Sequence, residues 1–385
     1  MLVNLKEFIS KNFLIVIFAL YLIFIFGIFF LSGNIKAANF TDGYILGGDS
    51  NRYINGANKI LNFELPREKD SSYLGYNLFI SIFQYFELNL TYVTIAQIFL
   101  TILSAICIYR ISKELSSDLG GLFSVSLYLF YFPLQKYNFY ILTETIFICS
   151  IIFIIYFLIF FKKKYIPILI FLTLYYILIR PHGVLIIPSL ILATLTWVYF
   201  NKKFKFFYLL IFLFILLSFP LYNFLNFHLE NMNIINNIAV GGIIHGYEDK
   251  SNFLEFNTPV NTNNDLLSLI YFFKDNFGVF MGSIYKKLYF FIFRVRPYYS
   301  EIHNLYIILY NFIYLPLAIY GLFKSHFNRK FYIYFLYSVI VIFSLSVTIS
   351  LVDWSGRFSL YIMPILFIFS GIGFHNLKKK IEIKF

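Results

Sequence analysis

The chain consists mainly of long apolar runs that are separated by short polar segments. Runs such as Leu14 to Leu31, Thr145 to Phe161 and Phe331 to Leu351 carry almost no charged residue. A bilayer core about 30 Å thick takes roughly 20 apolar residues per spanning helix. Each run with its flanking residues therefore predicts a membrane helix. About ten spans follow, at residues 13–31, 91–109, 119–133, 141–161, 166–179, 183–200, 206–226, 304–323, 331–350 and 358–374.

Composition supports an all-α polytopic membrane protein that forms a single domain over residues 1–385. The chain is 60% hydrophobic and 13% charged, whereas soluble domains are about 45–50% apolar and about 25% charged. Its two cysteines, Cys107 and Cys149, lie within apolar runs and have no CxxC pair or histidine cluster beside them. This arrangement predicts neither a disulfide framework nor a zinc site.

The distribution of charge predicts which side of the membrane each segment occupies. With the N-terminus inside, the inner segments hold 17 basic and 4 acidic residues, which leaves 14 basic and 15 acidic residues outside. The positive-inside rule therefore places both termini in the cytoplasm. The net charge of +12 is explained by short juxtamembrane anchors, such as Lys162 to Lys164, that face anionic lipid. No nucleic-acid partner is implied.

The first span has two interpretations. Lys36-Ala37-Ala38 follows it, as at a signal-peptide cleavage site. Its apolar stretch exceeds the usual h-region of about 7 to 15 residues, which favours an uncleaved anchor.

Two outer segments, 32–90 and 227–303, are long enough to carry polar chemistry. Within the second, Leu266 to Arg296 mixes apolar and basic residues. Basic side chains are costly at mid-bilayer, so this stretch predicts a pair of interfacial amphipathic helices.

Asp49 is the first candidate catalytic residue. It follows Gly48 and precedes an apolar-periodic stretch through Ala57, Ile60 and Leu61. One interpretation is a helix N-cap. The other is a carboxylate that accepts a proton from a hydroxyl nucleophile just outside the first span. Asp42 lies in the same segment, and the sequence does not decide between the two carboxylates.

Glu144 is the second candidate catalytic residue, at the outer edge of the fourth span. An ionisable residue at a membrane edge is expected to face the protein interior or a wet cavity. The alternative is that Glu144, behind Thr143, only caps its helix.

Arg180-Pro181-His182-Gly183 interrupts an apolar stretch of more than 30 residues, so Pro and Gly predict an outer turn. Arg180 either binds a phosphate with its forked guanidinium or extends to the interface. His182 is interpreted as a turn residue rather than a metal ligand.

The last outer turn, Val352 to Phe358, contains Arg357 and is followed by Tyr361 and Pro364. Trp354 in this turn is typical of an interface anchor. Four turns thus bring two carboxylates and two arginines to the outer face, which predicts a single site for an anionic substrate there.

These motifs together resemble the C-type (GT-C) glycosyltransferase superfamily, multi-spanning enzymes that use polyprenyl-phosphate-linked sugars. The most similar branch contains protein O-mannosyltransferases, aminoarabinose transferases and bacterial lipopolysaccharide-core transferases. Asp49, Tyr53 and Ala57 match the first-loop pattern D-x-x-x-Y-x-x-x-A. The other matching stretches are Ser72 to Phe79, Leu142 to Thr145, Leu178 to Gly183, and Arg357 through Tyr361 to Pro364.

The resemblance implies an inverting sugar transfer at the outer face of the inner (plasma) membrane. Asp49 would be the general base, and Glu144 would orient the acceptor or share that role. The donor would be a polyprenyl-phosphate sugar, and the acceptor a lipid, a glycan or a protein. The substrate-binding residues would be Arg52, Tyr53, Lys69, Arg180, His182, Arg357 and Tyr361, with Arg180 and Arg357 nominated for the phosphate.

The chain departs from the branch at two points. It has Asp49-Ser50 where the branch often has Asp-Glu, and it lacks a proline pair near residues 72–75. No cofactor is implied with certainty, no metal ligands are nominated, and a divalent metal stays open.

Two other functions are compatible with a multi-spanning chain. An oligosaccharide polymerase of the O-antigen type would need no catalytic carboxylate after the first span. A transporter or flippase predicts charges buried mid-span and internal inverted repeats. Here the charges collect at outer span ends, which favours an enzyme.

The predicted topology can be tested with cysteine replacements. Residues 33–40 and 240–260 should react with an impermeant thiol reagent added from outside, and positions near Lys163 or Lys203 should be protected. The reverse labelling pattern would contradict the charge argument and move the predicted site to the cytoplasm.

Overall fold

The computed structural model describes residues 2–34, 40–41, 43–64, 66, 68–203, 205, 208, 256–257, 265–325, 330–349 and 356–382. The chain divides into two compact units. Unit 1 comprises Met1–Pro188, Phe312–Asn328 and Leu360–Phe385, and unit 2 comprises Ser189–Asn311 and Arg329–Ser359.

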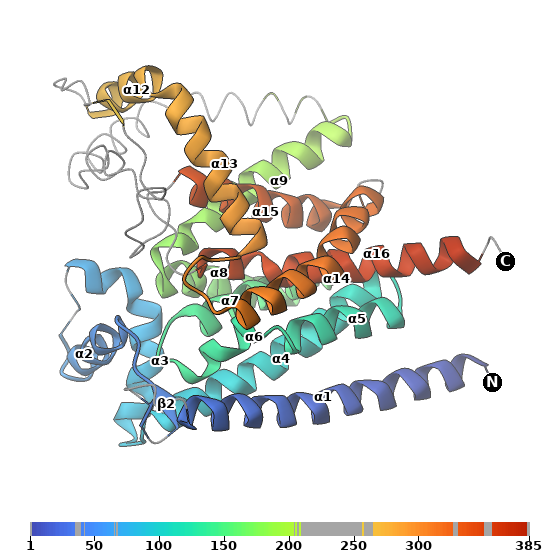
Figure 1. Ribbon diagram of the computed structural model, residues 1–385, viewed down its shortest axis with the longest axis horizontal. Helices are drawn as coiled ribbons and strands as arrows, with labels where there is room; N and C mark the ends of the chain where they lie inside the picture. The colour runs from blue at the N-terminus through green and yellow to red at the C-terminus, as the bar shows by residue number, and fades with distance from the viewer. Residues whose placement is uncertain are drawn as a thin grey trace. The chain divides into compact units, whose positions relative to one another are not determined.

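Helices make up almost all of the regular structure in the described residues (Figure 1). The first half of the chain contains α1 Leu2–Asn34, β1 Phe40–Thr41, β2 Tyr44–Ile45, α2 Ser50–Leu61, η1 Glu68–Tyr73, α3 Leu74–Tyr85, α4 Thr91–Leu115, α5 Asp118–Leu129, α6 Phe132–Gln135, η2 Lys136–Phe139, α7 Glu144–Ile159, η3 Lys163–Tyr165, α8 Ile166–Ile179, η4 Pro181–Leu185 and α9 Ile186–Phe200. The second half contains α12 Asp265–Asp275, α13 Phe277–Phe293, α14 Glu301–Ser325, α15 Phe331–Ile349, η6 Phe358–Tyr361 and α16 Met363–Glu382. The all-α prediction is therefore confirmed, apart from the two-residue strands β1 and β2.

Five helices in the described residues are long and apolar enough to cross a membrane. They are Asn12–Phe30, Thr91–Leu115, Pro181–Phe200, Glu301–Ser325 and Phe331–Thr348. The predicted span 206–226 lies outside the described residues apart from residue 208, as do 227–255 and 258–264 of the second outer segment. A membrane protein is thus supported, and the full set of about ten spans stays a prediction.

Two predicted spans are shorter than expected. α5 and α7 are apolar helices that fall short of the length of a spanning helix. α7 has 16 residues, which rise about 24 Å against a hydrocarbon core of about 30 Å. Both are instead deeply packed in unit 1, where most of their side chains are buried.

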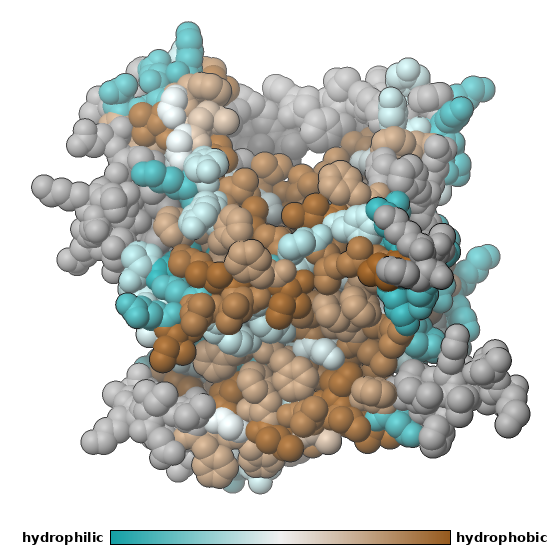
Figure 2. Space-filling view, turned by 45° about the vertical axis from the view of Figure 1, so that its right-hand side comes forward, coloured by the Kyte–Doolittle hydropathy of each residue, from teal (hydrophilic) through white to brown (hydrophobic). Residues whose placement is uncertain are grey.

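The surface of the helices is apolar where a soluble protein would be polar. On α1, Ile23 is 68% and Phe26 is 61% exposed, and on α14 Phe312 is 75% exposed. Figure 2 shows that apolar side chains make up much of the visible surface. Exposed apolar surface of this extent is a mark of contact with lipid or a partner.

Two helices of unit 1 that are not consecutive in the chain, α4 and α7, run in the same direction. In α4 and α7, Arg110 Nη1 donates a hydrogen bond to Tyr156 Oη at 3.0 Å near the ends of both helices, so the two run parallel. The start of α1 and the end of α16 lie at the same end of this unit, opposite α2 (Figure 1).

Small residues allow α5 and α16 to approach closely. A Cβ atom at Gly120 would lie 2.8 Å from the carbonyl oxygen of Gly371, and one at Gly371 would overlap the oxygen of Gly120. Ser124 Oγ donates to the carbonyl of Phe367 at 2.9 Å. Close backbone approach of this kind replaces the hydrophobic driving force that is lost between helices in lipid.

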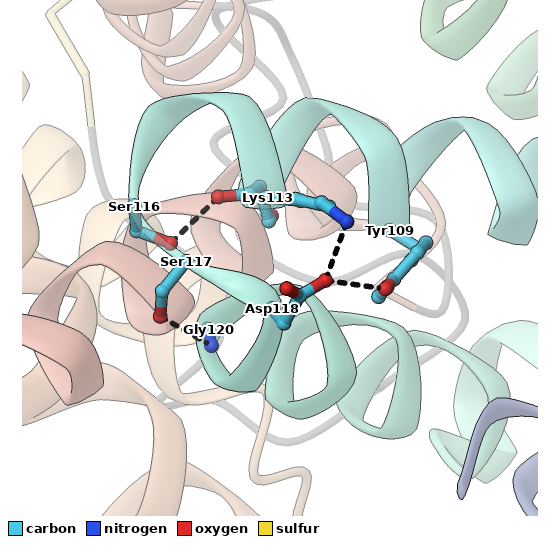
Figure 3. A network of polar contacts seen from close by, with 7 residues as sticks. Tyr109, Lys113, Ser116, Ser117, Asp118 and Gly120 are labelled. Atoms are coloured by element: carbon cyan, nitrogen blue, oxygen red, sulfur yellow. Dashed lines mark hydrogen bonds and ion pairs between the residues drawn. The ribbon is translucent and has the colours of Figure 1, made fainter. Parts of the chain in front are cut away.

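A polar network closes the turn between α4 and α5 (Figure 3). Asp118 Oδ1 accepts from Lys113 Nζ at 2.7 Å and from Tyr109 Oη at 2.8 Å. Ser117 caps α5 by accepting from the backbone of Gly120. Burial opposes the charge of Asp118, but these two donors outweigh burial and hold its pKa below the ordinary value. This side chain therefore stabilises the turn at neutral pH, and the stabilisation is lost as the pH falls through the lowered pKa.

Gly371→Leu should destabilise unit 1, because the larger side chain cannot fit between α16 and α5. Overpacking typically costs about 1–3 kcal/mol, which thermal unfolding of the detergent-purified protein would measure. Gly27→Leu on α1 is the control, since nothing lies within 4 Å of a Cβ atom there. Equal unfolding temperatures for the two variants would contradict the packing.

Candidate active site

The acidic turn that contains Asp49 is fastened to the segment that leads into α7. Ile45 of β2 forms a parallel bridge with Tyr140, and its carbonyl accepts from Ile141 N at 3.1 Å. Ser50 Oγ accepts from Gly47 N at 2.7 Å and donates to the carbonyl of Ile141 at 2.9 Å. Ser50 is fully buried. The turn is thus held only a few residues from the start of α7.

Asp49 stands at the N-cap position of α2 but does not cap it. Its backbone is already helical, with φ −95° and ψ −6°, and its side chain makes no capping hydrogen bond. N-cap residues usually have extended backbones and accept from the first turn. The carboxylate is 41% exposed and lies 3.7 Å from Arg52 Nη1. The capping interpretation is therefore wrong, and Asp49 presents a partly exposed carboxylate.

The face of α2 below Asp49 packs on α3. Tyr53 and Ala57 are buried at 2% and 0% exposure, at the four-residue spacing that places side chains on one helix face. The Tyr53 ring lies 5.1 Å from Tyr73 and 5.2 Å from Tyr76 between centroids. The residues of the D-x-x-x-Y-x-x-x-A pattern thus lie on one face of α2. Tyr53 and Ala57 are packed there, and the Asp49 carboxylate stands at the N-terminal end of that face.

Tyr53 also links the acidic turn to the second carboxylate. Burial raises the pKa of its phenol well above the ordinary value, and the charge of Glu144 raises it further while Arg180 acts in the opposite direction. Tyr73 and Asp49 add smaller increases. The phenol of Tyr53 therefore stays neutral, and the charges of both carboxylates act on it.

Glu144 and Arg180 form a buried ion pair. Arg180 Nη1 donates to Glu144 Oε1 at 2.8 Å and to Thr143 Oγ1 at 3.0 Å. Glu144 is 1% and Arg180 8% exposed. Thr143 makes no side-chain cap on α7, so Glu144 at the first helical position is held by the arginine.

The Arg-Pro-His-Gly turn positions this arginine. Steric clash disfavours the helical region for a residue before proline, and Arg180 is accordingly extended at φ −162° and ψ 147°, which ends α8. A Cβ atom at Gly183 would overlap the carbonyl of Tyr176, so the turn folds tightly onto α8. From the other side, a Cβ atom at Gly75 of α3 would lie 2.8 Å from Ile179 N. These contacts hold the backbone on both sides of Arg180 in place.

Aromatic rings cover the ion pair. The Arg180 guanidinium lies 5.4 Å from the ring centroid of Tyr361, which meets Phe147 edge-on at 4.7 Å. Phe147 in turn stacks on Tyr176 at 4.2 Å. Burial lowers the pKa of Arg180, but the oxygens of Tyr361 and Glu144 more than offset this, so the pKa lies above its ordinary value. The His182 ring lies 6.4 Å from Tyr361.

The predicted residues fall into three groups. Those assembled in unit 1 are Asp49, Arg52, Tyr53, Glu144, Arg180, His182 and Tyr361. Lys69 lies in η1, and Asp42, Trp354 and the side chain of Lys69 are outside the described residues. Arg357 belongs to unit 2. In the described part of the chain, no three His, Cys, Asp or Glu side chains are grouped to hold a metal.

Several contact residues were not predicted from the sequence, namely Ser50, Tyr73, Tyr76, Thr143, Phe147 and Tyr176. Their positions in the helices carried a signal for two of them. Phe147 is three residues after Glu144, so the two share a face of α7. Tyr176 lies in the last turn of α8, just before the extended Arg180.

Breaking the buried pair on one side should be costly. Arg180→Met alone leaves the charge of Glu144 unpaired, and Glu144→Gln alone leaves the charge of Arg180 unpaired. Either variant should lower the free energy of unfolding by about 3–5 kcal/mol. The double variant should lose much less than the sum, as measured by thermal unfolding in detergent.

The surface pair Lys113–Asp118 is the control, with an N–O distance of 2.7 Å and side chains 42% and 32% exposed. Its Lys113→Met variant should cost about 0–1 kcal/mol. Additive losses at Arg180 and Glu144 would show that the two are not coupled.

Comparison with known proteins assigns none of these residues a role. No protein-family model matches the sequence, and no curated protein matches it. The resemblance to the C-type glycosyltransferases therefore rests on the short motifs alone.

Proposed function

We propose that this protein is a multi-spanning membrane glycosyltransferase with a C-type architecture of about ten spans. It would transfer a sugar from a polyprenyl-phosphate donor to a lipid, glycan or protein acceptor at the outer face of the inner membrane. One observation carries the proposal: Ser50 Oγ donates to the carbonyl of Ile141, which fastens the Asp49 turn beside the Glu144–Arg180 pair. The two hydrogen-bonded residues are 91 positions apart in the chain, so the two short motifs beside them are brought close together.

Asp49 is the better candidate for the general base. A base must reach a proton on the bound acceptor, and the Asp49 side chain is 41% exposed whereas Glu144 is 1% exposed and ion-paired. In the proposed step, the acceptor hydroxyl gives its proton to Asp49 while its oxygen bonds to the anomeric carbon. The bond from that carbon to the phosphate oxygen breaks, and the lipid phosphate leaves with the electron pair.

The Glu144–Arg180 pair would position rather than react. A buried, hydrogen-bonded ion pair is rigid because each charge needs the other. It supports the neutral phenol of Tyr53, which senses both charges and can donate a hydrogen bond to a sugar or acceptor oxygen. Glu144 would thus act on the acceptor through its neighbours, the first of the two roles considered for it.

The leaving phosphate requires a cation. Arg52 is suited to this role, because it is half-buried and lies beside the Asp49 carboxylate. Its guanidinium also lies 5.8 Å from the ring centroid of Tyr73, which restricts its orientation. Arg180 would contribute positive potential from within the protein, His182 and Tyr361 would line the same region, and Lys69 and Arg357 stay candidates from the sequence. The exposed apolar helices would accommodate the polyprenyl tail beside the site.

A transporter is less well supported by these contacts. Such a protein predicts ionisable residues at the middle of its spans. Glu144 begins α7 and Arg180 follows α8, so both charges stand at helix ends. An oligosaccharide polymerase would leave the partly exposed Asp49 without a role.

Asp49→Asn should abolish sugar transfer while membrane insertion and thermal unfolding stay close to wild type. The side chain makes no capping hydrogen bond to lose, and the substitution removes only the basic oxygen. General-base catalysis contributes about a hundredfold to ten-thousandfold. Transfer from a polyprenyl-phosphate sugar in proteoliposomes would measure the loss.

Asp42→Asn is the matched control, seven residues nearer the first span, and should retain activity. Loss of activity in this control with full activity in Asp49→Asn would assign the base to Asp42. Full activity in both variants would remove the main support for a glycosyltransferase.

A further inference from the structure

Helix α3 is apolar on both of its sides. Tyr76 and Ile80 are buried on one side, where α3 packs against α2 and α8. On the opposite side, Leu78, Ile82 and Tyr85 follow at four- and three-residue spacing, which places them on one helix face. All three are exposed, Ile82 at 56% and Tyr85 at 71%. The sequence of α3 contains no charged residue, and a helix that is apolar all round is typical of a protein core or of a membrane.

Helix α2, which packs on α3, exposes a different kind of side chain. Asn51, Asn55 and Asn58 follow at four- and three-residue spacing, and Asn62 at the C-cap continues the row. All four are exposed, so they form one amide face. Amide groups lose hydrogen bonds when they leave water, whereas the removal of apolar side chains from water is favourable. The two neighbouring helices therefore present surfaces that are suited to two different media.

Both ends of α3 meet the ends of other helices in unit 1. At its start, a Cβ atom at Gly75 would lie 2.8 Å from the backbone nitrogen of Ile179, the last residue of α8. At its end, a short connection with the exposed Glu87 and Asn89 leads into α4, and such polar side chains are costly inside hydrocarbon. α3 has 12 residues, which rise about 18 Å and cannot span a bilayer core of about 30 Å. It therefore runs between helix ends, at the end of the unit opposite the start of α1 (Figure 1).

The exposed face of α3 continues along the chain into α4. Phe86, directly after α3, is 64% exposed. On α4, Tyr92, Ile95 and Phe99 are exposed, again at three- and four-residue spacing. Because α4 is one of the helices long and apolar enough to cross a membrane, lipid is the expected neighbour of this side. Tyr85 and Tyr92 stand on either side of the junction, and tyrosine is enriched where a membrane meets water.

We propose that lipid at the membrane surface covers the exposed face of α3. This face is formed by Leu78, Ile82, Tyr85 and Phe86. Lipid fits it better than a second copy of the chain, because the face is continuous with the exposed side of a candidate span. α2 packs on the other side of α3 through the rings of Tyr53 and Tyr76, 5.2 Å apart between centroids, and so holds Asp49 near the lipid headgroups. The inference goes beyond the proposed function, because contact with lipid requires no sugar transfer.

Fluorescence quenching of the full-length protein in liposomes tests this contact. A bimane label is attached to Ile82→Cys, with Ile95→Cys on α4 as the reference for lipid and Asn55→Cys on α2 as the reference for water. Cys107 and Cys149 are replaced by serine in every variant. Lipids with a doxyl spin label near the headgroup end of the acyl chain should quench the label at Ile82 about as strongly as at Ile95 and more strongly than at Asn55. Iodide in the buffer should quench the labels in the reverse order.

Leu78→Cys, one turn earlier on the same face, repeats the measurement where Ile82→Cys does not fold. Two results would overturn the proposal. Quenching by iodide as strong as at Asn55 would place the face in water. Quenching by neither agent would mean that protein covers it, and a disulfide between two Ile82→Cys chains would identify that protein as a second copy. Asp49→Asn should leave the quenching by lipid unchanged, so failure of the proposed sugar transfer and failure of the lipid contact are separate outcomes.

Discussion

The buried ion pair between Glu144 and Arg180 is the interaction on which the candidate site depends. Two charges removed from water are stable only when each is closely matched, and here one guanidinium nitrogen contacts both Glu144 and Thr143. The pair joins the first turn of α7 to the residue that follows α8. The proline, glycine and stacked aromatic residues around the pair keep Arg180 in one position. The start of α7 and the end of α8 are therefore fixed relative to each other.

The acidic turn adds a second carboxylate with a different environment. Asp49 is held beside the pair through the buried hydroxyl of Ser50, yet its own oxygens are partly exposed. A carboxylate that must exchange protons with a substrate needs access, whereas one that orients neighbours needs burial and a fixed partner. Asp49 and Glu144 differ in this way, which is the reason for proposing a reacting role for Asp49 and a positioning role for Glu144.

Elsewhere in the described residues, apolar and ionisable side chains occupy different parts of the surface. Exposed apolar side chains cover α1 and α14, while ionisable groups collect at turns such as the Lys113–Asp118 network (Figure 3). Arg294 and Arg296 near Gly356 depart from this pattern, because they are buried and lie together.

The sequence alone determined the helical class, the positions of most helices and the residues that share the D-x-x-x-Y-x-x-x-A face, because apolar periodicity and proline or glycine signals act over short distances along the chain. It also singled out Glu144 and Arg180. Only the tertiary structure decided that these two pair, that Asp49 does not cap α2, that α5 and α7 are short, and that Arg294 and Arg296 meet at Gly356. Such outcomes depend on contacts between residues far apart in the chain, and a side chain's partner or exposure is set by which helices pack together rather than by its neighbours in sequence.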